Sequence, residues 1–330
     1  MDNKMRILLN YNYLHPHTTG HYVKKVLDSK NISYKLKLHN ELMADCNKDF
    51  DVLLTIDDGE HNFLPSMAQI KKSIWIIDTH ISLSKDILIL MDYDFIFCAQ
   101  KDAVIKLKTF GFTNVVWLPL ACDPDIHFCK KTCENIYTVG FVGNAGTNER
   151  EILLQNLKTK FSNSYIGKAK FEDMACIYSS SKVAFNKSIK KDLNMRVFEV
   201  LCSGTPLVTD YIEDIDELGL GKYITYYNND QEIESKINYV LENLEDKKEL
   251  AIKAKNEVFN KHSYKVRVDT IIDTSLNNTP MSHKLIFPFN ILNKSQILKK
   301  SFLNRYLNYV VLFLVDKKYL ISILKQKVKR

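Results

Sequence analysis

The sequence lacks the segments that direct a chain into or across a membrane. Residues 1–4 lead directly into an apolar, strand-like run, without the charged stretch and long apolar stretch of a secretory signal. The longest apolar run near the C-terminus, 307–315, ends at Asp316-Lys317-Lys318, whereas a spanning helix needs about 20 apolar residues. We therefore predict no transmembrane helix and a cytoplasmic protein.

A disulfide scaffold is also missing. The seven cysteines are odd in number and follow no regular spacing, and several lie within apolar runs, where a free thiol behaves as a small buried hydrophobe. We therefore predict reduced cysteines, as in a cytosolic protein. One group has the residue types that bind zinc, but its spacing is not that of a standard site, so zinc stays the weaker alternative. The group consists of Cys122, His127, Cys129 and Cys133.

Neither the G-x-G-x-x-G fingerprint of dinucleotide-binding proteins nor a Walker motif is present. Instead, a strand-like run at 139–142 leads into Gly143, Asn144, Ala145 and Gly146, and a helical pattern follows. Small residues allow a ligand to approach the backbone, and a helix N-terminus favours phosphate. An ordinary strand–helix turn explains the same pattern, so this feature alone is a weak signal.

The positive charge is unevenly distributed. The formal net charge is +7, and residues 299–330 contribute nine Lys or Arg against one acidic residue, Asp316. Apolar and aromatic residues recur at helical spacing over 302–315. For 284–330 we predict a basic amphipathic helix on an anionic membrane surface or, equally, a helix packed on the N-terminal domain with solvated lysines. Nucleic acid is not predicted as a partner, because the basic residues gather in one tail and no stacking platform is evident.

Two regions alternate short apolar runs with helical patterns. In the first 125 residues, strands are predicted at 6–11, 34–38, 51–56, 73–78, 95–98 and 115–118, and helices at 18–30 and 102–110. From residue 137, strands are predicted at 137–143, 181–186, 205–210 and 223–227, and helices at 149–161, 196–202, 231–244 and 247–260. Apolar strands separated by helices are typical of parallel sheets covered on both faces, so we predict an α/β protein with two doubly wound domains. The predicted domains are 1–133 and 134–276, followed by the tail 277–330.

The most unusual segment runs from Asn194 to Asp210. Arg196 and Glu199 lie one turn apart and therefore on one helix face. Glu199 directly precedes an apolar stretch, and a carboxylate so close to a buried region needs hydrogen-bond donors, such as two ribose hydroxyls. The planar fork of Arg196 suits a diphosphate. A solvated Arg–Glu pair is the alternative interpretation.

The same segment carries a family resemblance. The stretch 137–272 resembles the C-terminal domain of group 1 glycosyltransferases, especially the CgeB-like, spore-maturation-protein type. The matching pieces are Gly140–Gly143, Leu193–Glu199, Gly204–Asp210, and Asn260–Tyr264 with Arg267. Earlier in the chain, Trp117–Pro124 with His127, and Asp78–His80, also look like that family.

The resemblance implies the GT-B architecture, in which two Rossmann-like domains face a cleft. It also implies transfer of a sugar from a nucleotide-sugar donor, UDP- or GDP-linked, to a glycan, lipid-linked glycan or protein. The donor nucleotide would bind around Asn194, with Arg196 facing the diphosphate, Glu199 holding the ribose, and the turn at Gly143 and Asn144 close by. No metal or other cofactor is expected, because helix N-termini and basic side chains offset the charge of the leaving diphosphate. Retention of configuration is the family expectation.

One position departs from the family pattern. Many group 1 enzymes carry two glutamates with seven residues between them; Glu199 would be the second, and Lys191 stands at the first. His80, after a predicted strand, is the candidate catalytic base, with a structural hydrogen-bonding role as an equal alternative. Thr19 and Gly20 are candidates for the acceptor side, although an ordinary helix start explains them as well. A nucleotide-sugar epimerase and a non-catalytic binding protein of the same fold stay open as alternatives.

Three of the Asp-x-Asp triplets in the sequence suggest a different class, a GT-A enzyme with a metal-bound diphosphate. They lie at 92–94, 123–125 and 214–216. A triplet is weak support in a chain with 39 acidic residues. The tandem α/β pattern also does not suit a single GT-A domain.

Overall fold

The structure is a computed structural model that describes most of the chain outside the tail. The described residues are 5–15, 18–42, 49–59, 70–79, 89–129, 136–170 and 173–283, with the single residues Leu64, Met67, Leu83 and Ile87. The chain divides into two compact units, unit 1 (Met1–Pro119 with Thr270–Arg330) and unit 2 (Leu120–Asp269). Two predictions, His80 and the tail 284–330, lie outside the described residues. No helix within the described ranges is long and apolar enough to cross a membrane.

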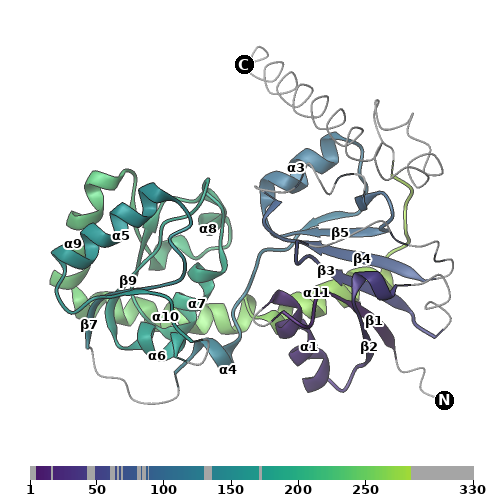
Figure 1. Ribbon diagram of the computed structural model, residues 1–330, viewed down its shortest axis with the longest axis horizontal. Coiled ribbons are helices and arrows are strands. Elements are labelled where there is room, and N and C mark those ends of the chain that lie inside the picture. Colours follow the sequence, from purple (N-terminus) through teal and green to yellow (C-terminus); the bar gives the residue numbers. More distant parts are fainter. Residues whose placement is uncertain are drawn as a thin grey trace, which may run out of the picture. The chain divides into compact units, whose positions relative to one another are not determined.

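Unit 1 is built on a six-stranded parallel sheet with the order β2-β1-β3-β4-β5-β6 (Figure 1). β3 is buried along its whole length, whereas β2 at the edge is partly exposed. A central strand of a parallel sheet is covered on both faces, which explains the uninterrupted apolar runs of the sequence. The strands are β1 (Arg6–Asn10), β2 (Ser33–Lys37), β3 (Val52–Ile56), β4 (Lys71–Ile76), β5 (Phe95–Cys98) and β6 (Val115–Trp117).

Helices follow the first and fifth strands of unit 1, as predicted. α1 (Thr19–Ser29) follows β1, and α3 (Lys101–Thr109) follows β5; a short 3₁₀ turn, η1 (His39–Glu41), follows β2. Ala103 and Leu107 of α3 join the core cluster that contains Leu8 and Ile74 of the sheet. The helices therefore cover the sheet with their apolar stripes, as surface helices of α/β proteins do.

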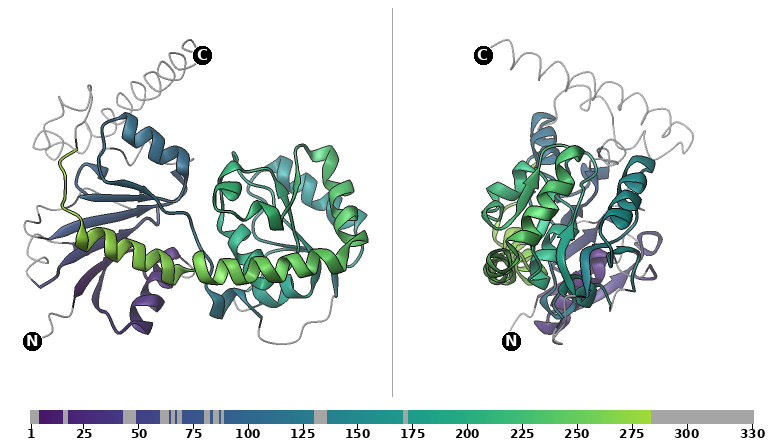
Figure 2. Two further views of the ribbon diagram at one scale, coloured as in Figure 1. Left: turned by 180° about the vertical axis from the view of Figure 1, so that it is seen from behind. Right: turned by 90° about the vertical axis from the view of Figure 1, so that its left-hand side faces the viewer.

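The chain returns to unit 1 at its C-terminal end. α11 (Tyr264–Asn277) directly follows α10 (Leu244–Lys261) along the chain (Figure 2). Ser275 Oγ near the end of α11 lies 2.7 Å from Ser73 Oγ of β4, and both side chains are buried. Residues 270–283 therefore complete unit 1, although they follow unit 2 in the sequence.

Unit 2 contains a five-stranded parallel sheet with the order β11-β10-β9-β7-β8. Four of its strands confirm the prediction, with ends that differ by one or two residues. The fifth strand, β8, was not predicted, because its three residues are only partly buried and carry no apolar run. The strands are β7 (Tyr137–Val142), β8 (Tyr165–Gly167), β9 (Ser181–Phe185), β10 (Leu207–Asp210) and β11 (Thr225–Tyr227).

Helices cover both faces of the second sheet. α5 and α9 pack on one face, where their apolar residues meet Phe141, Phe185 and Val208, and α6 and α7 pack on the other (Figure 1). α7 also contacts α10 on its outer side, and it is buried from Val197 to Ser203. The helices are α4 (Pro124–His127), α5 (Asn148–Lys160), α6 (Met174–Ser179), α7 (Met195–Ser203), α8 (Glu213–Glu217) and α9 (Ile233–Glu242), with the 3₁₀ turns η2 (Gly221–Tyr223) and η3 (Asp230–Glu232).

Two of the family-like segments pair where the chain enters and leaves unit 2. Cys122 N donates to His262 O at 3.0 Å, and Tyr264 N donates to Cys122 O at 2.9 Å. Arg267 reaches the same place, where its Nη2 donates to Leu120 O at 3.4 Å. These residues therefore tie the two ends of unit 2 together.

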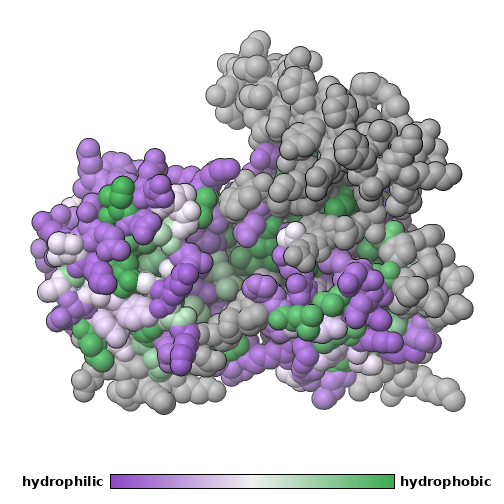
Figure 3. Space-filling model, viewed as in Figure 1, coloured by the Kyte–Doolittle hydropathy of each residue, from purple (hydrophilic) through white to green (hydrophobic). Residues whose placement is uncertain are grey.

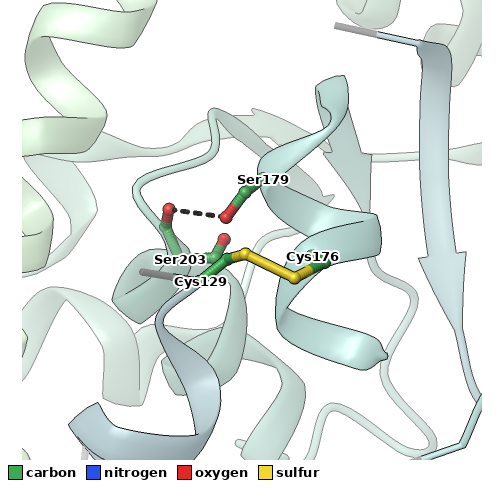
Figure 4. Close-up of a disulfide and its surroundings, with 4 residues drawn as sticks. All are labelled: Cys129, Cys176, Ser179 and Ser203. Carbon is green, nitrogen blue, oxygen red and sulfur yellow. Dashed lines mark hydrogen bonds between the residues drawn. A yellow bond between two sulfur atoms is a disulfide. The ribbon is translucent and has the colours of Figure 1, made fainter. Parts of the chain in front are cut away.

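A disulfide corrects the prediction of seven reduced cysteines. Cys129, just after α4, is bonded to Cys176 of α6 across a sequence separation of 47 residues, with the two Cα atoms 5.1 Å apart (Figure 4). Nearby, Ser179 Oγ donates to Ser203 O at 3.4 Å. No local pattern links two cysteines so far apart, and only the packing of α4 beside α6 brings them to bonding distance. Cys129 is also not available as a thiolate ligand for the weaker zinc alternative.

The surface of unit 2 carries scattered apolar side chains. Ile152 on α5 and Ile252 on α10 are 63% and 51% exposed. On the face drawn in Figure 3, apolar areas of this unit alternate with hydrophilic ones. Single exposed apolar residues are normal for globular proteins and need no partner to explain them.

Candidate functional site

The site lies at the carboxyl edge of the sheet of unit 2, between β7 and β9. The chain passes from β7 to β8 on one side and then crosses to β9 on the other side. The loops after β7 and β9 therefore diverge, and in open parallel sheets ligands bind at such a switch point. These two loops are 143–147 and 186–194.

Arg196 in the first turn of α7 spans this switch point. Its Nε donates to Val142 O at the end of β7 at 3.0 Å, and its Nη1 donates to Asn186 Oδ1 at 2.8 Å. The guanidinium also lies over the ring of Phe141, with Cζ 4.4 Å from the ring centroid. Three contacts thus hold a cation at the switch point, and no described acidic side chain forms an ion pair with it.

Gly143 is a glycine because Arg196 lies against it. Its φ is +144°, in the region that favours glycine, and a Cβ at this position would overlap the guanidinium of Arg196. Gly143 N donates to Gly167 O at the end of β8 at 2.9 Å. The neighbouring Asn144 is exposed. The turn predicted at Gly143 and Asn144 is therefore brought next to Arg196.

Asn186 is a site residue that the sequence did not reveal. It is fully buried and follows β9 directly, and its Nδ2 donates to Thr209 Oγ1 at 3.0 Å. Its Oδ1 accepts from Arg196 and, at 3.4 Å, from Asn194 Nδ2. The available signal was a polar residue at the end of an otherwise apolar strand. Asn186 positions Arg196 and Asn194.

Arg150 is a second cation that was missed. It is only 5% exposed, and its Nε is buried without a hydrogen-bond partner in the described structure. Its Cζ lies 5.2 Å from the centroid of the Phe141 ring, the ring that Arg196 also contacts. Burial, and next the charge of Arg196, lower the pKa of Arg150 to about 10. The signal available in the sequence was an arginine in the first turn of a helix, where the helix dipole disfavours a cation.

Glu199 lies one turn further into α7. It is 7% exposed, no described donor hydrogen-bonds to its carboxylate, and burial raises its pKa to about 7, although Arg196 acts in the opposite direction. The alternative of a solvated Arg–Glu pair is wrong, because Glu199 is buried and the described structure contains no ion pair between it and Arg196. A buried carboxylate without donors is suited to accept hydrogen bonds from a ligand.

The N-terminus of α7 is open, whereas that of α5 is capped. Thr147 Oγ1 accepts from Arg150 N at 3.3 Å at the start of α5. At the start of α7, Asn194 makes no side-chain cap, the first turn has no acidic residue, and Asn194 Oδ1 is buried without a partner. Uncapped N–H groups beside a guanidinium form an anion-binding arrangement.

The residues predicted for the acceptor side lie in unit 1. Thr19 and Gly20 are in the first turn of α1, and a Cβ at Gly20 would overlap the ring of the buried Tyr11. A packing role therefore accounts for Gly20. Next to His80 in the sequence, Thr79 donates twice to Gln100 Oε1, from N at 3.2 Å and from Oγ1 at 2.8 Å. The roles of Thr19, Gly20 and His80 stay predictions.

The Asp-x-Asp triplets serve local structure. Asp94 accepts from Lys72 N at 2.7 Å, and Asp123 accepts from Asp125 N at 2.9 Å at the start of α4. Asp216 accepts from Tyr226 Oη at 3.0 Å. Backbone and hydroxyl donors thus engage one carboxylate of each triplet.

Residues 137–273 match the family model described as glycosyl transferase-like. The match covers all strands of unit 2 and includes Asn186, Arg196 and Glu199. No curated protein matches the sequence.

Several solved structures share the two-unit fold. A sucrose-phosphate synthase from Thermosynechococcus elongatus matches with a TM-score of 0.56 and 10% identity over 82% of this chain and 98% of that one. A DNA-modifying β-glucosyltransferase, studied with and without uridine diphosphoglucose, matches with a TM-score of 0.55 and 16% identity over 83% and 100%. A protein from Listeria monocytogenes, provisionally assigned as a UDP-N-acetylglucosamine 2-epimerase, matches with a TM-score of 0.50 and 11% identity over 86% and 100%.

At identities of 10–16%, these likenesses show the fold. The predicted α/β class with two parallel, doubly wound sheets of GT-B type is confirmed. The family model and the fold together indicate a glycosyltransferase-like protein.

Proposed function

We propose that this protein transfers a sugar from a nucleoside-diphosphate sugar to an acceptor. The observation that carries the proposal is Arg196, which is held at the switch point between β7 and β9 and forms no ion pair with an acidic side chain of the described residues. A diphosphate supplies the missing negative charge, and the arginine fork binds two of its oxygens. The match of this unit to a glycosyl transferase-like family supports the same function.

The donor lies along α7 in this proposal. The ribose hydroxyls donate to Glu199, and the diphosphate binds Arg196 and the open N-terminus formed by Asn194. The turn at Gly143 and Asn144 approaches the diphosphate, and Arg150 adds a second positive charge beside the shared Phe141 ring. UDP and GDP are the proposed nucleotides.

The site provides charge stabilisation for the leaving group. As the bond between sugar and diphosphate breaks, negative charge builds on the diphosphate, and two fixed guanidinium groups and the α7 dipole offset it. We propose that the transfer needs no metal and retains the anomeric configuration. His80 is the proposed acid–base group on the acceptor side, near the segment with Thr19 and Gly20.

The acceptor is proposed to be a glycan, a lipid-linked glycan or a protein. The basic and apolar composition of 284–330 supports a cytoplasmic protein that binds peripherally to an anionic membrane. Sedimentation with vesicles of anionic lipid tests this part, and a protein that stays in the supernatant overturns it.

A nucleotide-sugar epimerase is the second candidate, supported by the likeness to the Listeria monocytogenes structure. An epimerase would use the same nucleotide site, but its product would be another nucleotide sugar. Incubation with UDP-N-acetylglucosamine and chromatography of the products separates the two candidates. A new sugar still linked to UDP supports the epimerase, and release of UDP with a glycosylated acceptor supports the transferase.

The direct test of the donor site is calorimetric titration with UDP, GDP, ADP, CMP and dTDP. We expect one diphosphate to bind, and Glu199→Ala to weaken that binding by about tenfold or more, because hydrogen bonds to a charged group are lost. Binding by none of the five nucleotides removes the basis for a transferase. That outcome leaves a non-catalytic protein of the same fold.

A further inference from the structure

The loop between β9 and α7 contains a turn of unusual composition. Asp192 N donates to Ile189 O at 3.1 Å, and the two central residues, Lys190 and Lys191, have φ values of +53° and +62°. This is the geometry of a type I′ turn, which favours Asn-Gly because both central residues are left-handed. A lysine in this conformation is strained, whereas a glycine is not. A Lys-Lys sequence here is therefore not explained by the backbone.

Neighbouring groups hold the turn in place. Ile189 N donates to Asp192 Oδ1 at 2.7 Å. Lys191 Nζ donates to Tyr211 O at 3.1 Å and lies 3.1 Å from Asp210 Oδ2. Both interactions fix the ammonium of Lys191 at the carboxyl end of β10.

The carboxylate of Asp210 accepts hydrogen bonds from a residue other than Lys191. Its carboxylate accepts from Ser188 N at 2.8 Å and from Ser188 Oγ at 2.6 Å, and its side chain is only 8% exposed. The side chain of Lys191, by contrast, is 59% exposed. The ammonium has three hydrogens, and the described residues accept only two of them. One donor of Lys191 is thus left for a ligand.

The turn lies next to the proposed diphosphate site. Ile189 approaches the loop after β7 so closely that a Cβ at Gly146 would lie 3.2 Å from Ile189 Cδ1. Along the chain, the turn with Lys191 comes first, followed by Arg196 and then Glu199. The loop that carries Lys191 leads into the N-terminus of α7. A donor with its ribose at Glu199 and its diphosphate at Arg196 runs along α7 towards this N-terminus, so its sugar extends towards that loop.

We propose that Lys191 selects a donor whose sugar carries a carboxylate, that is, a nucleoside-diphosphate uronic acid. This inference rests on the proposed function, because it needs the donor to lie along α7. An exposed ammonium with a free donor hydrogen-bonds a carboxylate more strongly than a neutral hydroxyl, since both partners are charged. This selection accounts for a Lys at a position where a Gly would have less backbone strain.

The test compares donors that differ only in this group. Calorimetric titration uses UDP-glucuronate against UDP-glucose and GDP-mannuronate against GDP-mannose, with the purified full chain. For the pair whose nucleotide binds, we expect the acidic donor to bind about tenfold more tightly. Lys191→Met keeps the stem without the charge and should remove the preference. Lys187→Met is the matched control. Both carboxylate oxygens of Asp230 accept from Lys187 Nζ at 2.6 Å and the Lys187 side chain is 25% exposed, against 59% for Lys191, so this change should leave the ratio unchanged.

A second variant uses stability as the readout. The double change Lys190→Asn and Lys191→Gly removes the backbone strain of two lysines with positive φ. We therefore expect Tm to rise by a few degrees, while the preference for the acidic donor is lost. Equal binding of both donors, or a preference that survives Lys191→Met, overturns the inference and leaves the proposed function intact. Absence of binding by every donor overturns both.

Discussion

The sheets of the two units begin with the same strand arrangement, but the side chains at their switch points carry opposite charges. In each, the second strand and the third strand flank the first, so the loops after the first and third strands diverge. In unit 2 this edge holds two guanidinium groups, Arg150 and Arg196. In unit 1 it holds two carboxylates, Asp57 and Asp58, which follow β3.

The acids of unit 1 accept hydrogen bonds from backbone N–H groups, whereas the two arginines of unit 2 form no ion pair among the described residues. Asp57 accepts from Gly59 N and Ile77 N, each at 2.9 Å, and Asp58 accepts from Asn12 N. A carboxylate edge repels a diphosphate, and an unpaired guanidinium edge attracts it. The comparison teaches that topology provides the crevice and that a few side chains decide which ligand it takes.

The largest expected effect concerns the stability of unit 2 alone. Replacing Cys129 and Cys176 by Ser opens a loop of 47 residues, and we expect a loss of about 4 kcal/mol in the free energy of unfolding. Both tryptophans, Trp75 and Trp117, lie in unit 1. Circular dichroism should therefore show an earlier transition that tryptophan fluorescence does not follow.

A reducing agent should act on the unchanged protein as the double variant does, and it should have no effect on the double variant itself. Alkylation and mass spectrometry supply the direct check. Free thiols at both positions in protein prepared without reductant contradict the disulfide.

The next effect concerns the guanidinium edge. Arg196→Gln should weaken nucleotide binding about 100-fold, or about 3 kcal/mol, because a charged hydrogen-bond donor to the diphosphate is lost. Calorimetric titration measures the change. Arg6→Gln in unit 1 is the matched control, because Arg6 lies in an exposed ion pair with Asp49 at 3.8 Å and should not affect binding. Unchanged affinity of the Arg196 variant places the nucleotide elsewhere.

Two glycines, one in each unit, should differ in their effect on nucleotide binding. Gly20→Ala forces a Cβ into the ring of buried Tyr11, so we expect a loss of about 2 kcal/mol of stability in unit 1. Gly143→Ala strains the backbone at a φ of +144° and also displaces the end of the Arg196 side chain, so we expect a loss of stability together with a fall in binding of about 30-fold. Thermal unfolding and titration of both variants test the contrast. A Gly143 variant that binds normally argues against a diphosphate at this turn.

The smallest effect is the pH dependence of binding. In the free protein, burial raises the pKa of Glu199 to about 7, and the proposed ribose contact needs the carboxylate. Affinity should therefore fall as pH drops below 7 and level off near the loss of about tenfold expected for Glu199→Ala, once the carboxyl group is protonated. The same shift lowers stability as pH rises from about 4.5 to 7, because the folded protein keeps a proton that the unfolded chain has released.

Glu199→Gln is the matched variant, because the terminal phosphate of the nucleotide itself titrates near pH 6. Subtracting the pH profile of binding of the Glu199→Gln variant isolates the contribution of the Glu199 carboxylate. Identical profiles for the two proteins exclude Glu199 from the ribose contact.

The sequence alone determined the fold class and the helix that carries the site. β5 was predicted at its observed residues and β7 to within one residue, because continuous apolar runs are a local signal. Arg196 and Glu199 were found together because they share one helix turn and a local motif. β8 and α6 were not predicted, because β8 is short and half-buried and α6 has only six residues, too few to show a clear helical period.

The tertiary structure alone decided which groups surround that helix. Asn186 and Val142 reach Arg196 from the ends of two different strands, and Arg150 comes from a third element. The Cys129–Cys176 bond likewise joins elements that no periodicity relates. Sequence patterns report only on residues that are close together along the chain. A site at a switch point is built from distant chain segments, which meet only after the strands have paired in their final order in the sheet.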